Sequence, residues 1–60
     1  MQKRFIGIQE LAEYLDISIN TARTWVWQRQ IPYHKLGRLV KFDIIELNEW
    51  LKDRKVKELN

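Results

Sequence analysis

The sequence has no cysteine, one histidine, one proline and two glycines among its 60 residues. Without cysteine there are no disulfide bonds and no zinc site of the usual Cys-containing kind, and His34 alone offers a metal little to bind. The low glycine and proline content and the 45% of hydrophobic residues favour a folded domain over a disordered chain. The core must therefore rest on apolar packing, and we expect neither a metal nor another cofactor.

Long apolar runs are missing as well. No stretch approaches the roughly 20 apolar residues of a membrane span, and residues 1–6 are too short and too soon polar to be a signal peptide. The length predicts one domain over residues 1–60, with its core at about 5–52 and a basic tail at 53–60. We expect a soluble, cytoplasmic protein of modest stability, which does not bind membranes.

Acidic residues are absent from the centre of the chain. All eight acids lie outside the 26 residues between Asp16 and Asp43, whereas that stretch carries five basic residues: Arg23, Arg29, Lys35, Arg38 and Lys41. A net charge of +3 says little by itself. A basic, acid-free centre between flanks of mixed charge indicates a surface that faces a negatively charged partner, and it points to nucleic acid.

Two short helices are predicted in the first half of the chain. Apolar residues spaced i, i+3, i+4 and i+7 predict a helix over 8–15 with Gly7 as its N-cap. Ser18 is expected to cap a second helix over 19–29. The inner face of that helix is predicted to hold Ala22, Trp25, Val26 and the stem of Arg29. Two helices joined by a short turn, the second with a polar outer face, form a helix-turn-helix arrangement.

A hairpin and a third helix follow. Two short runs around Gly37 and Arg38 predict a β-hairpin over 33–42, with the glycine at a positive-φ position of the turn. Asp43 then starts the last helix and forms, with Glu46, a pattern that resembles a capping box. The inner stripe of this helix is expected at Ile44, Leu47, Trp50, Leu51 and the stem of Arg54. The predicted fold is mostly α with a small β-hairpin wing, a winged helix-turn-helix of order α-α-β-β-α.

Four segments resemble a known family. In chain order they are Phe5-x-x-Ile8-Gln9-Glu10-Leu11-Ala12-Glu13-Tyr14-Leu15-Asp16-Ile17-Ser18, Thr21-Ala22-Arg23-Thr24-Trp25, Ile31-Pro32-Tyr33-x-x-Leu36-Gly37-Arg38 and Asp43-x-x-x-Leu47-x-x-Trp50-Leu51. They resemble the small excisionase-type helix-turn-helix domains of the MerR-like winged-helix group. The resemblance implies DNA binding, with the second helix in the major groove and the wing on the backbone or minor groove. Many members assist a tyrosine integrase in excising a phage or mobile element, and others regulate transcription.

The chain departs from the family pattern at several positions. The family often has glycine after the recognition helix, where this chain has Arg29 and Gln30. A non-glycine residue held left-handed there costs on the order of 1 kcal/mol, so either the turn differs or that cost is accepted. Asp16 also replaces a frequent glycine, which aspartate tolerates better than most residues. Thr24 and Trp27 replace positions often held by arginine or aromatic residues, so the base preference is not transferred.

The candidate DNA-contacting residues fall on two predicted elements. They are Ser18, Asn20, Thr21, Arg23, Thr24, Trp27 and Gln28 on the second helix, and Lys35, Arg38 and Lys41 on the hairpin. Arg23 can form two hydrogen bonds with guanine, and Asn20 can do the same with adenine. Two alternatives stay open: Arg23 contacts a phosphate, or this face of the helix is only solvated. Ser18 is foremost a helix cap, although the helix N-terminus behind it can also meet a phosphate.

Other positions keep alternative interpretations. Arg38 at the hairpin tip can enter a narrow minor groove, or the basic residues of the hairpin merely protect an exposed edge strand. Three alternatives are left open for Trp27: it packs under the wing, it stacks on sugar-phosphate, or it contacts a neighbouring protomer. His34 is expected to be a surface strand residue. The basic tail is a solvated helix end or a contact for protein or DNA backbone, and its charges are Lys52, Arg54, Lys55 and Lys57.

These patterns predict a sequence-specific protein for double-stranded DNA, of the excisionase type, which bends or marks DNA beside an integrase site. An enzyme is not expected, because the chain has no nucleophile motif and no phosphate loop. The alternatives are a transcriptional regulator of the same fold and a protein-interaction module. One module contacts few base pairs, so further copies on adjacent sites are expected partners. Five phosphate-bound cations would give a salt slope of roughly −4.5.

Overall fold

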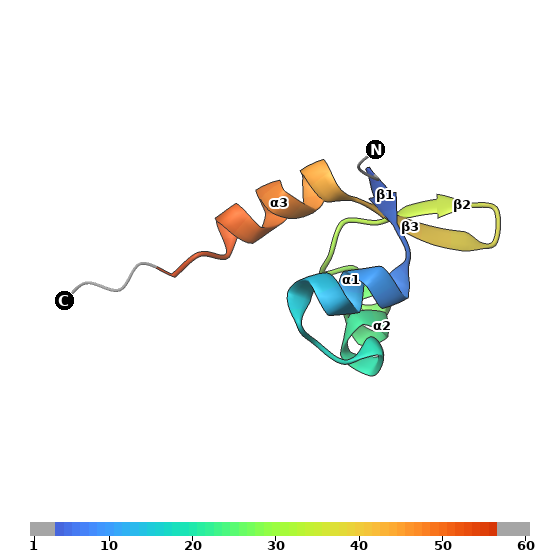
Figure 1. The fold of residues 1–60 in the computed structure, drawn as a ribbon, viewed down its shortest axis with the longest axis horizontal. Coiled ribbons are helices and arrows are strands. Elements are labelled where there is room, and N and C mark those ends of the chain that lie inside the picture. The colour runs from blue at the N-terminus through green and yellow to red at the C-terminus, as the bar shows by residue number, and fades with distance from the viewer. Residues whose placement is uncertain (1–3, 57–60) are drawn as a thin grey trace.

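The computed structural model describes residues 4–56, which form a helix-turn-helix with a β-wing and a closing helix (Figure 1). The described part contains three helices and one three-stranded antiparallel sheet. In chain order the elements are β1 (Phe5–Ile6), α1 (Ile8–Leu15), α2 (Ile19–Trp27), β2 (His34–Leu36), β3 (Leu39–Asp43) and α3 (Ile44–Asp53). The predicted winged helix-turn-helix is confirmed. No helix in this part of the chain combines the length and apolar character that crossing a membrane requires.

Strand β1 was not predicted from the sequence. It pairs with β3, with Phe5 opposite Asp43 and Ile6 opposite Phe42, so that β3 lies in the middle of the sheet in the order β1-β3-β2. Two residues are too few to show the alternation by which a strand is recognised. The strand pairs the residues before α1 with the wing, and the sheet thereby connects the wing to the helices.

The turn between α1 and α2 is closed by a left-handed residue. Asp16 has φ 55°, and its amide donates to the carbonyl of Glu13 at 3.2 Å, while the amide of Ile17 donates to that of Ala12 at 2.9 Å. This pair of bonds is the Schellman motif, which ends helices and satisfies their last carbonyls. Helix α1 has the predicted bounds, and Gly7 is its N-cap.

Helix α2 begins as predicted and ends earlier. The hydroxyl of Ser18 accepts a hydrogen bond from the amide of Thr21 at 3.1 Å, which confirms the predicted cap. The helix stops at Trp27, so the predicted end at residue 29 was two residues too late.

The end of α2 repeats the Schellman geometry with an arginine in the left-handed position. Arg29 has φ 57°, its amide donates to the carbonyl of Val26 at 3.0 Å, and the amide of Gln30 donates to that of Trp25 at 2.9 Å. The turn at the family's glycine position is therefore kept, and the conformational cost of a non-glycine residue is accepted. Because the chain changes direction here, the side chain of Arg29 is exposed, and the prediction that its stem lies on the inner face was wrong.

The wing is a two-residue hairpin. Strands β2 and β3 pair from His34 opposite Lys41 to Leu36 opposite Leu39, which leaves Gly37 and Arg38 as the turn. Gly37 has φ 62°, whereas Arg38 has a negative φ, a combination that fits a type II′ turn. The predicted hairpin and its positive-φ glycine are confirmed.

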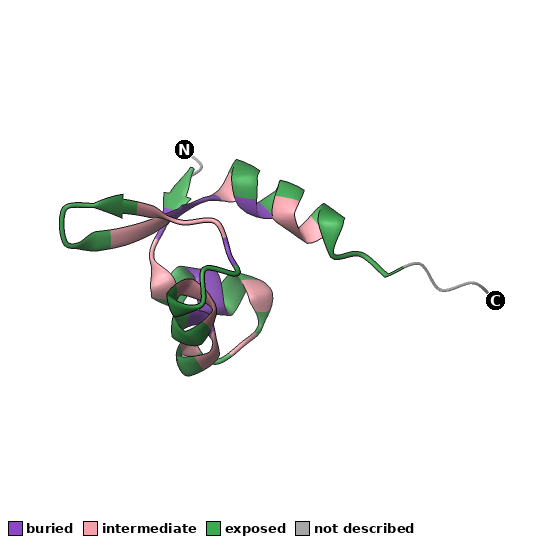
Figure 2. Ribbon diagram, turned by 180° about the vertical axis from the view of Figure 1, so that it is seen from behind, coloured by how far each residue is buried: buried purple, intermediate pink, exposed green. Residues whose placement is uncertain are grey.

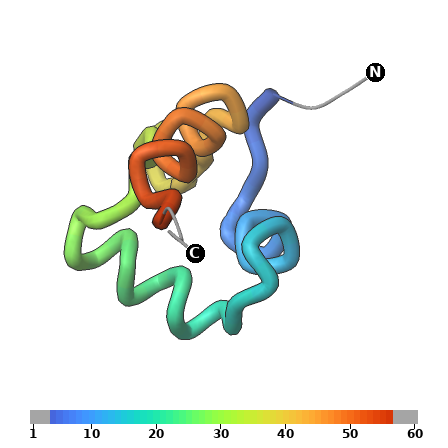
Figure 3. Tube along the Cα trace, turned by 90° about the vertical axis from the view of Figure 1, so that its left-hand side faces the viewer, coloured from blue at the N-terminus to red at the C-terminus, as the bar shows by residue number. Residues whose placement is uncertain are grey.

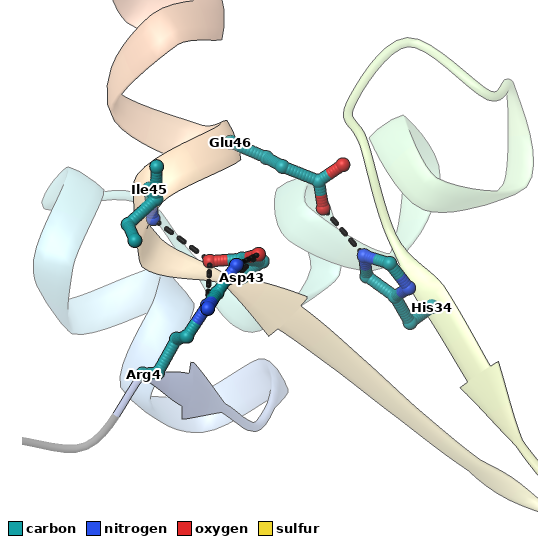
Figure 4. Close-up of polar contacts among 5 residues, drawn as sticks. All are labelled: Arg4, His34, Asp43, Ile45 and Glu46. Atoms are coloured by element: carbon teal, nitrogen blue, oxygen red, sulfur yellow. Dashed lines mark hydrogen bonds and ion pairs between the residues drawn. The ribbon is translucent and has the colours of Figure 1, made fainter.

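The start of α3 is fixed by a buried aspartate (Figure 4). The carboxylate of Asp43 accepts from the amide of Ile45 at 3.0 Å and from two guanidinium nitrogens of Arg4, Nε at 3.2 Å and Nη2 at 3.1 Å. The hydrogen bond from Arg4 holds the pKa of Asp43 below its usual value, although burial of the carboxyl acts in the opposite direction. The amide of Glu46 also helps to lower the pKa of Asp43, as the first half of the predicted capping box requires. The second half is not formed, because the carboxylate of Glu46 contacts the imidazole of His34.

The core lies where the sheet meets the helices, and Figure 2 shows its buried residues on the inner sides of these elements. Every element except β2 supplies part of this cluster, and the linker before β2 adds Ile31. Its members are Ile6, Leu11, Ala12, Ala22, Ile31, Phe42 and Leu47. Phe42, at the centre of the sheet, is fully buried. The core therefore joins the wing to both helices of the helix-turn-helix.

Helix α3 is held against the end of α2 by an aromatic contact at the edge of the core. The rings of Trp25 and Trp50 lie 6.0 Å apart, and the indole nitrogen of Trp50 donates to the carbonyl of Gln30 at 2.7 Å. The guanidinium of Arg54 also covers the ring of Trp50, at 4.2 Å from its centroid. Both tryptophans are partly buried and pack against the core. Seen from the side, α2 runs across the directions of α1 and α3 (Figure 3).

Candidate nucleic-acid interface

The outer face of α2 carries the candidate residues that the sequence predicts for this helix. Asn20, Arg23, Thr24, Trp27 and Gln28 are exposed. The first four positions recur at spacings of three and four residues, so they share one face of the helix. The sequence therefore predicted which face of α2 is turned to solvent.

Some of these side chains are engaged within the helix. The hydroxyl of Ser18 donates to that of Thr21 at 2.9 Å, and the hydroxyl of Thr24 donates to the carbonyl of Asn20 at 2.9 Å. Ser18 and Thr21 thus stabilise the start of α2. Their predicted role in DNA contact stays a prediction, as does that of Thr24.

An open groove separates α2 from the wing. Its volume is about 590 Å³, and Gly7 and Ile8 lie at its inner end. Its two walls consist of Arg23, Val26 and Trp27 from α2, and of Arg38, Leu39, Val40 and Lys41 from the turn and β3. Among residues 4–56, none of those that line it is acidic. The groove is thus lined by apolar and basic residues.

Four predicted contact residues meet at this groove, namely Arg23, Trp27, Arg38 and Lys41. The fold brings them together because β3, through Phe42, packs into the same core as α2. The remaining candidate on the wing, Lys35, is exposed on β2 opposite Val40 and does not line the groove. Asn20, Thr24 and Gln28 also lie outside the groove lining.

The basic residues of the chain differ in whether they have partners. Arg4 pairs with Asp43, Lys52 pairs with Glu49, and Arg54 lies on Trp50. By contrast, the side chains of Arg23, Arg38 and Lys41 form no hydrogen bond or ion pair with another residue of the described part. The groove cations therefore keep their hydrogen-bonding capacity for a ligand.

Trp27 projects from the rim of the groove and is 85% exposed. Of the three alternatives for Trp27, packing under the wing does not fit this exposure, because Val26, the preceding residue, takes the half-buried position against the core. Contact with sugar-phosphate or with a neighbouring protomer stays a prediction. Two apolar residues of the wing were missed by the sequence interpretation. Leu36 and Leu39 face each other at the hairpin tip and are 55% and 60% exposed. Strand alternation relative to the buried Phe42 would have placed Leu39 on the outer face.

A second polar cluster lies at the junction of β1, β2 and α3 (Figure 4). Potential ligand atoms of His34, Asp43 and Glu46 lie within 4.8 Å of one another. The carboxylate of Asp43, however, already accepts hydrogen bonds from the guanidinium of Arg4, so a metal ion would have to displace another cation. The ring of Phe5 packs edge-on against His34 at 5.5 Å. The cluster therefore joins three elements of the scaffold.

The fold and this groove define a winged helix-turn-helix protein that presents one helix and one hairpin on a basic face. The family model described as a helix-turn-helix domain matches residues 5–55, and the chain belongs to that family. It is a small DNA-binding helix-turn-helix protein, and its ligand is double-stranded DNA. No curated protein and no solved structure matches the chain significantly.

Proposed function

We propose that this protein is an excisionase-type architectural factor of the MerR-like winged-helix group. It binds a specific duplex site with α2 in the major groove and the wing on the adjacent backbone or minor groove. There it bends or marks the DNA so that a tyrosine integrase excises a mobile element. The observation that carries the proposal is the groove between α2 and the wing, whose three cations have no partner among residues 4–56.

The charge of the groove fits a phosphate backbone. Each neutralised phosphate contributes about −0.9 to the dependence of log affinity on log salt concentration, so the three groove cations alone give a slope of about −2.7. Contacts from Lys35 and Arg29 would bring it to roughly −4.5. An affinity that does not change between low and moderate salt would contradict this mode of binding.

The excisionase role rests on the resemblance of four segments in order along residues 5–52 to that family. The protein contributes no chemical step in this role. The polar residues of the groove are two arginines and a lysine, which are suited to binding phosphates. Because one module contacts few base pairs, several copies bind adjacent sites cooperatively.

The test is an excision assay with a candidate integrase, combined with binding to the DNA site that random-sequence selection recovers. Arg23→Glu and Arg38→Glu should each abolish DNA binding and excision, while circular dichroism shows an intact fold. Lys55→Glu, a charge reversal at an exposed residue beyond the end of α3, is the matched control and should bind normally, because the proposed interface does not include the tail.

Other outcomes would replace the proposal. If excision does not depend on the protein while a promoter near the site responds to it, the protein is a transcriptional regulator. If both groove reversals leave DNA binding unchanged, the surface serves a protein partner instead. Direct repeats in the selected sites would indicate head-to-tail copies, whereas inverted repeats would indicate a two-fold dimer.

A further inference from the structure

Trp27 is the largest exposed apolar side chain in the described part of the chain. Its exposed fraction is 85%, although tryptophan is among the residues most buried on average. The other two tryptophans contact each other at the edge of the core. The indole of Trp27 therefore contributes little to the packing of the fold.

The surroundings of Trp27 combine apolar and basic groups. Arg23 lies one helical turn before it on α2, and Arg38 and Lys41 lie across the groove. Val26, Leu39 and Val40 line the same groove. An exposed indole in such a setting suits a ligand that carries both charged groups and apolar surface.

One DNA strand has that character. Its phosphates carry one negative charge each and are separated by deoxyribose rings, whose carbon faces are apolar. Aromatic side chains pack on such surfaces and on base faces without depending on the base sequence. A peptide with alternating acidic and apolar residues would match the walls as well, but the groove adjoins the outer face of α2, which is the face proposed to enter the major groove.

We propose that the groove seats the sugar-phosphate backbone of one strand of the bound duplex, and that the indole of Trp27 packs on the deoxyribose between phosphates held by Arg23 and Arg38. This inference rests on the proposed DNA-binding mode. Trp27 supplies the apolar, salt-independent part of the affinity, whereas the cations supply the salt-dependent part.

The test uses the full chain and a duplex with one isolated binding site, titrated at several salt concentrations. Trp27→Ala should weaken binding by roughly 10-fold at every salt concentration, with an unchanged salt slope. Arg38→Gln should instead lower the magnitude of the slope by about 0.9. Trp27→Phe should keep most of the affinity, because a ring remains to cover the sugar.

Val56→Ala is the matched control, because Val56 is an apolar residue with an exposed fraction of 83% beyond α3, and it should not change affinity. Thermal unfolding of Trp27→Ala should match the wild type, since its side chain contributes little to the core. An unchanged single-site affinity, or a changed salt slope, would overturn the inference. Loss of cooperative binding to adjacent sites without loss at the single site would assign Trp27 to a contact with a second copy instead. The DNA-binding mode itself fails if Arg23→Glu and Arg38→Glu both leave binding intact, or if the wild-type affinity does not change with salt.

Discussion

Replacing Arg29 with glycine should stabilise the protein. Arg29 has φ 57° at the end of α2, a conformation that costs a non-glycine residue about 1–2 kcal/mol. Glycine relieves that strain, but it also raises the entropy of the unfolded chain, which opposes folding by about 0.4–1 kcal/mol. The net gain is about 0.5–1 kcal/mol in the free energy of unfolding. For a domain of 60 residues this corresponds to a rise of about 2–8 °C in Tm.

The structure gives no reason to expect an offsetting loss. The side chain of Arg29 is exposed and has no hydrogen bond or ion pair within residues 4–56, and the two amide bonds of the turn involve backbone atoms that glycine keeps. The assay is urea and thermal unfolding followed by circular dichroism, with DNA affinity measured alongside.

Gln28→Gly is the matched control for Arg29→Gly. Gln28 is the exposed neighbour with φ −81°, a right-handed conformation in which glycine only adds entropy to the unfolded chain. It should lower stability by about 0.5–1 kcal/mol. Asp16→Gly, at φ 55°, should gain less than Arg29→Gly because aspartate visits the left-handed region more readily. The reasoning is refuted if Arg29→Gly is no more stable than the wild type, or if it shifts in the same direction as Gln28→Gly.

Three further predictions address the scaffold and the groove. Asp43→Asn removes the ion pair with Arg4 and should lower the urea midpoint at pH 7. Because the folded-state pKa of Asp43 is lowered, the contribution of its charge to stability is complete above the ordinary value of 3.8 and is lost as pH falls through the folded-state pKa. Variant and wild type should therefore converge in acid, and a constant difference would contradict the pairing. Phe42→Ala should cost about 3–5 kcal/mol, comparable with the whole stability of so small a domain, so a cooperative transition near the wild-type midpoint would speak against its central place in the core. Arg23→Gln and Arg38→Gln should each reduce the magnitude of the salt slope of DNA binding by about 0.9, measured by titration over a range of KCl, and an additive loss of about 1.8 is expected of the double variant.

Features of the fold that depend on neighbours in the sequence were predictable. Ser18 and Asp43 cap their helices through amides two or three residues away, and Gly37 meets the demand of a two-residue turn. Pairings between residues far apart in the sequence were not predictable. Strand β1 is recognisable only through its partner on β3, and the hydrogen bond between Arg4 and Asp43 spans 39 positions.

The early end of α2 shows a different limit. Local preference argues against a left-handed arginine, so the sequence favoured a helix that continues through Arg29. The fold requires the chain to turn back there, because Ile31 is buried in the core and the carbonyl of Gln30 accepts a hydrogen bond from the indole nitrogen of Trp50. Tertiary packing therefore overrides the local cost. The same reasoning explains why the position of Trp27 relative to the wing could not be derived from its helical face alone.

The acid-free stretch indicates more than net charge, because it determines which cations have a carboxylate partner. Outside it, three of the four cations in residues 4–56 have partners: Arg4 pairs with Asp43, Lys52 pairs with Glu49, and Arg54 lies on Trp50. A cation already paired with a carboxylate must lose that partner before it binds a phosphate, and the exchange gains little free energy. In the groove no acid lines either wall, so in the proposed binding mode Arg23 and Arg38 would meet a phosphate without first losing a carboxylate partner. The absence of acids between Asp16 and Asp43 thus leaves the groove cations without carboxylate partners. In the proposed binding mode, the acids on α1 and α3 would repel a phosphate backbone that approaches the scaffold side, and so favour one orientation of binding.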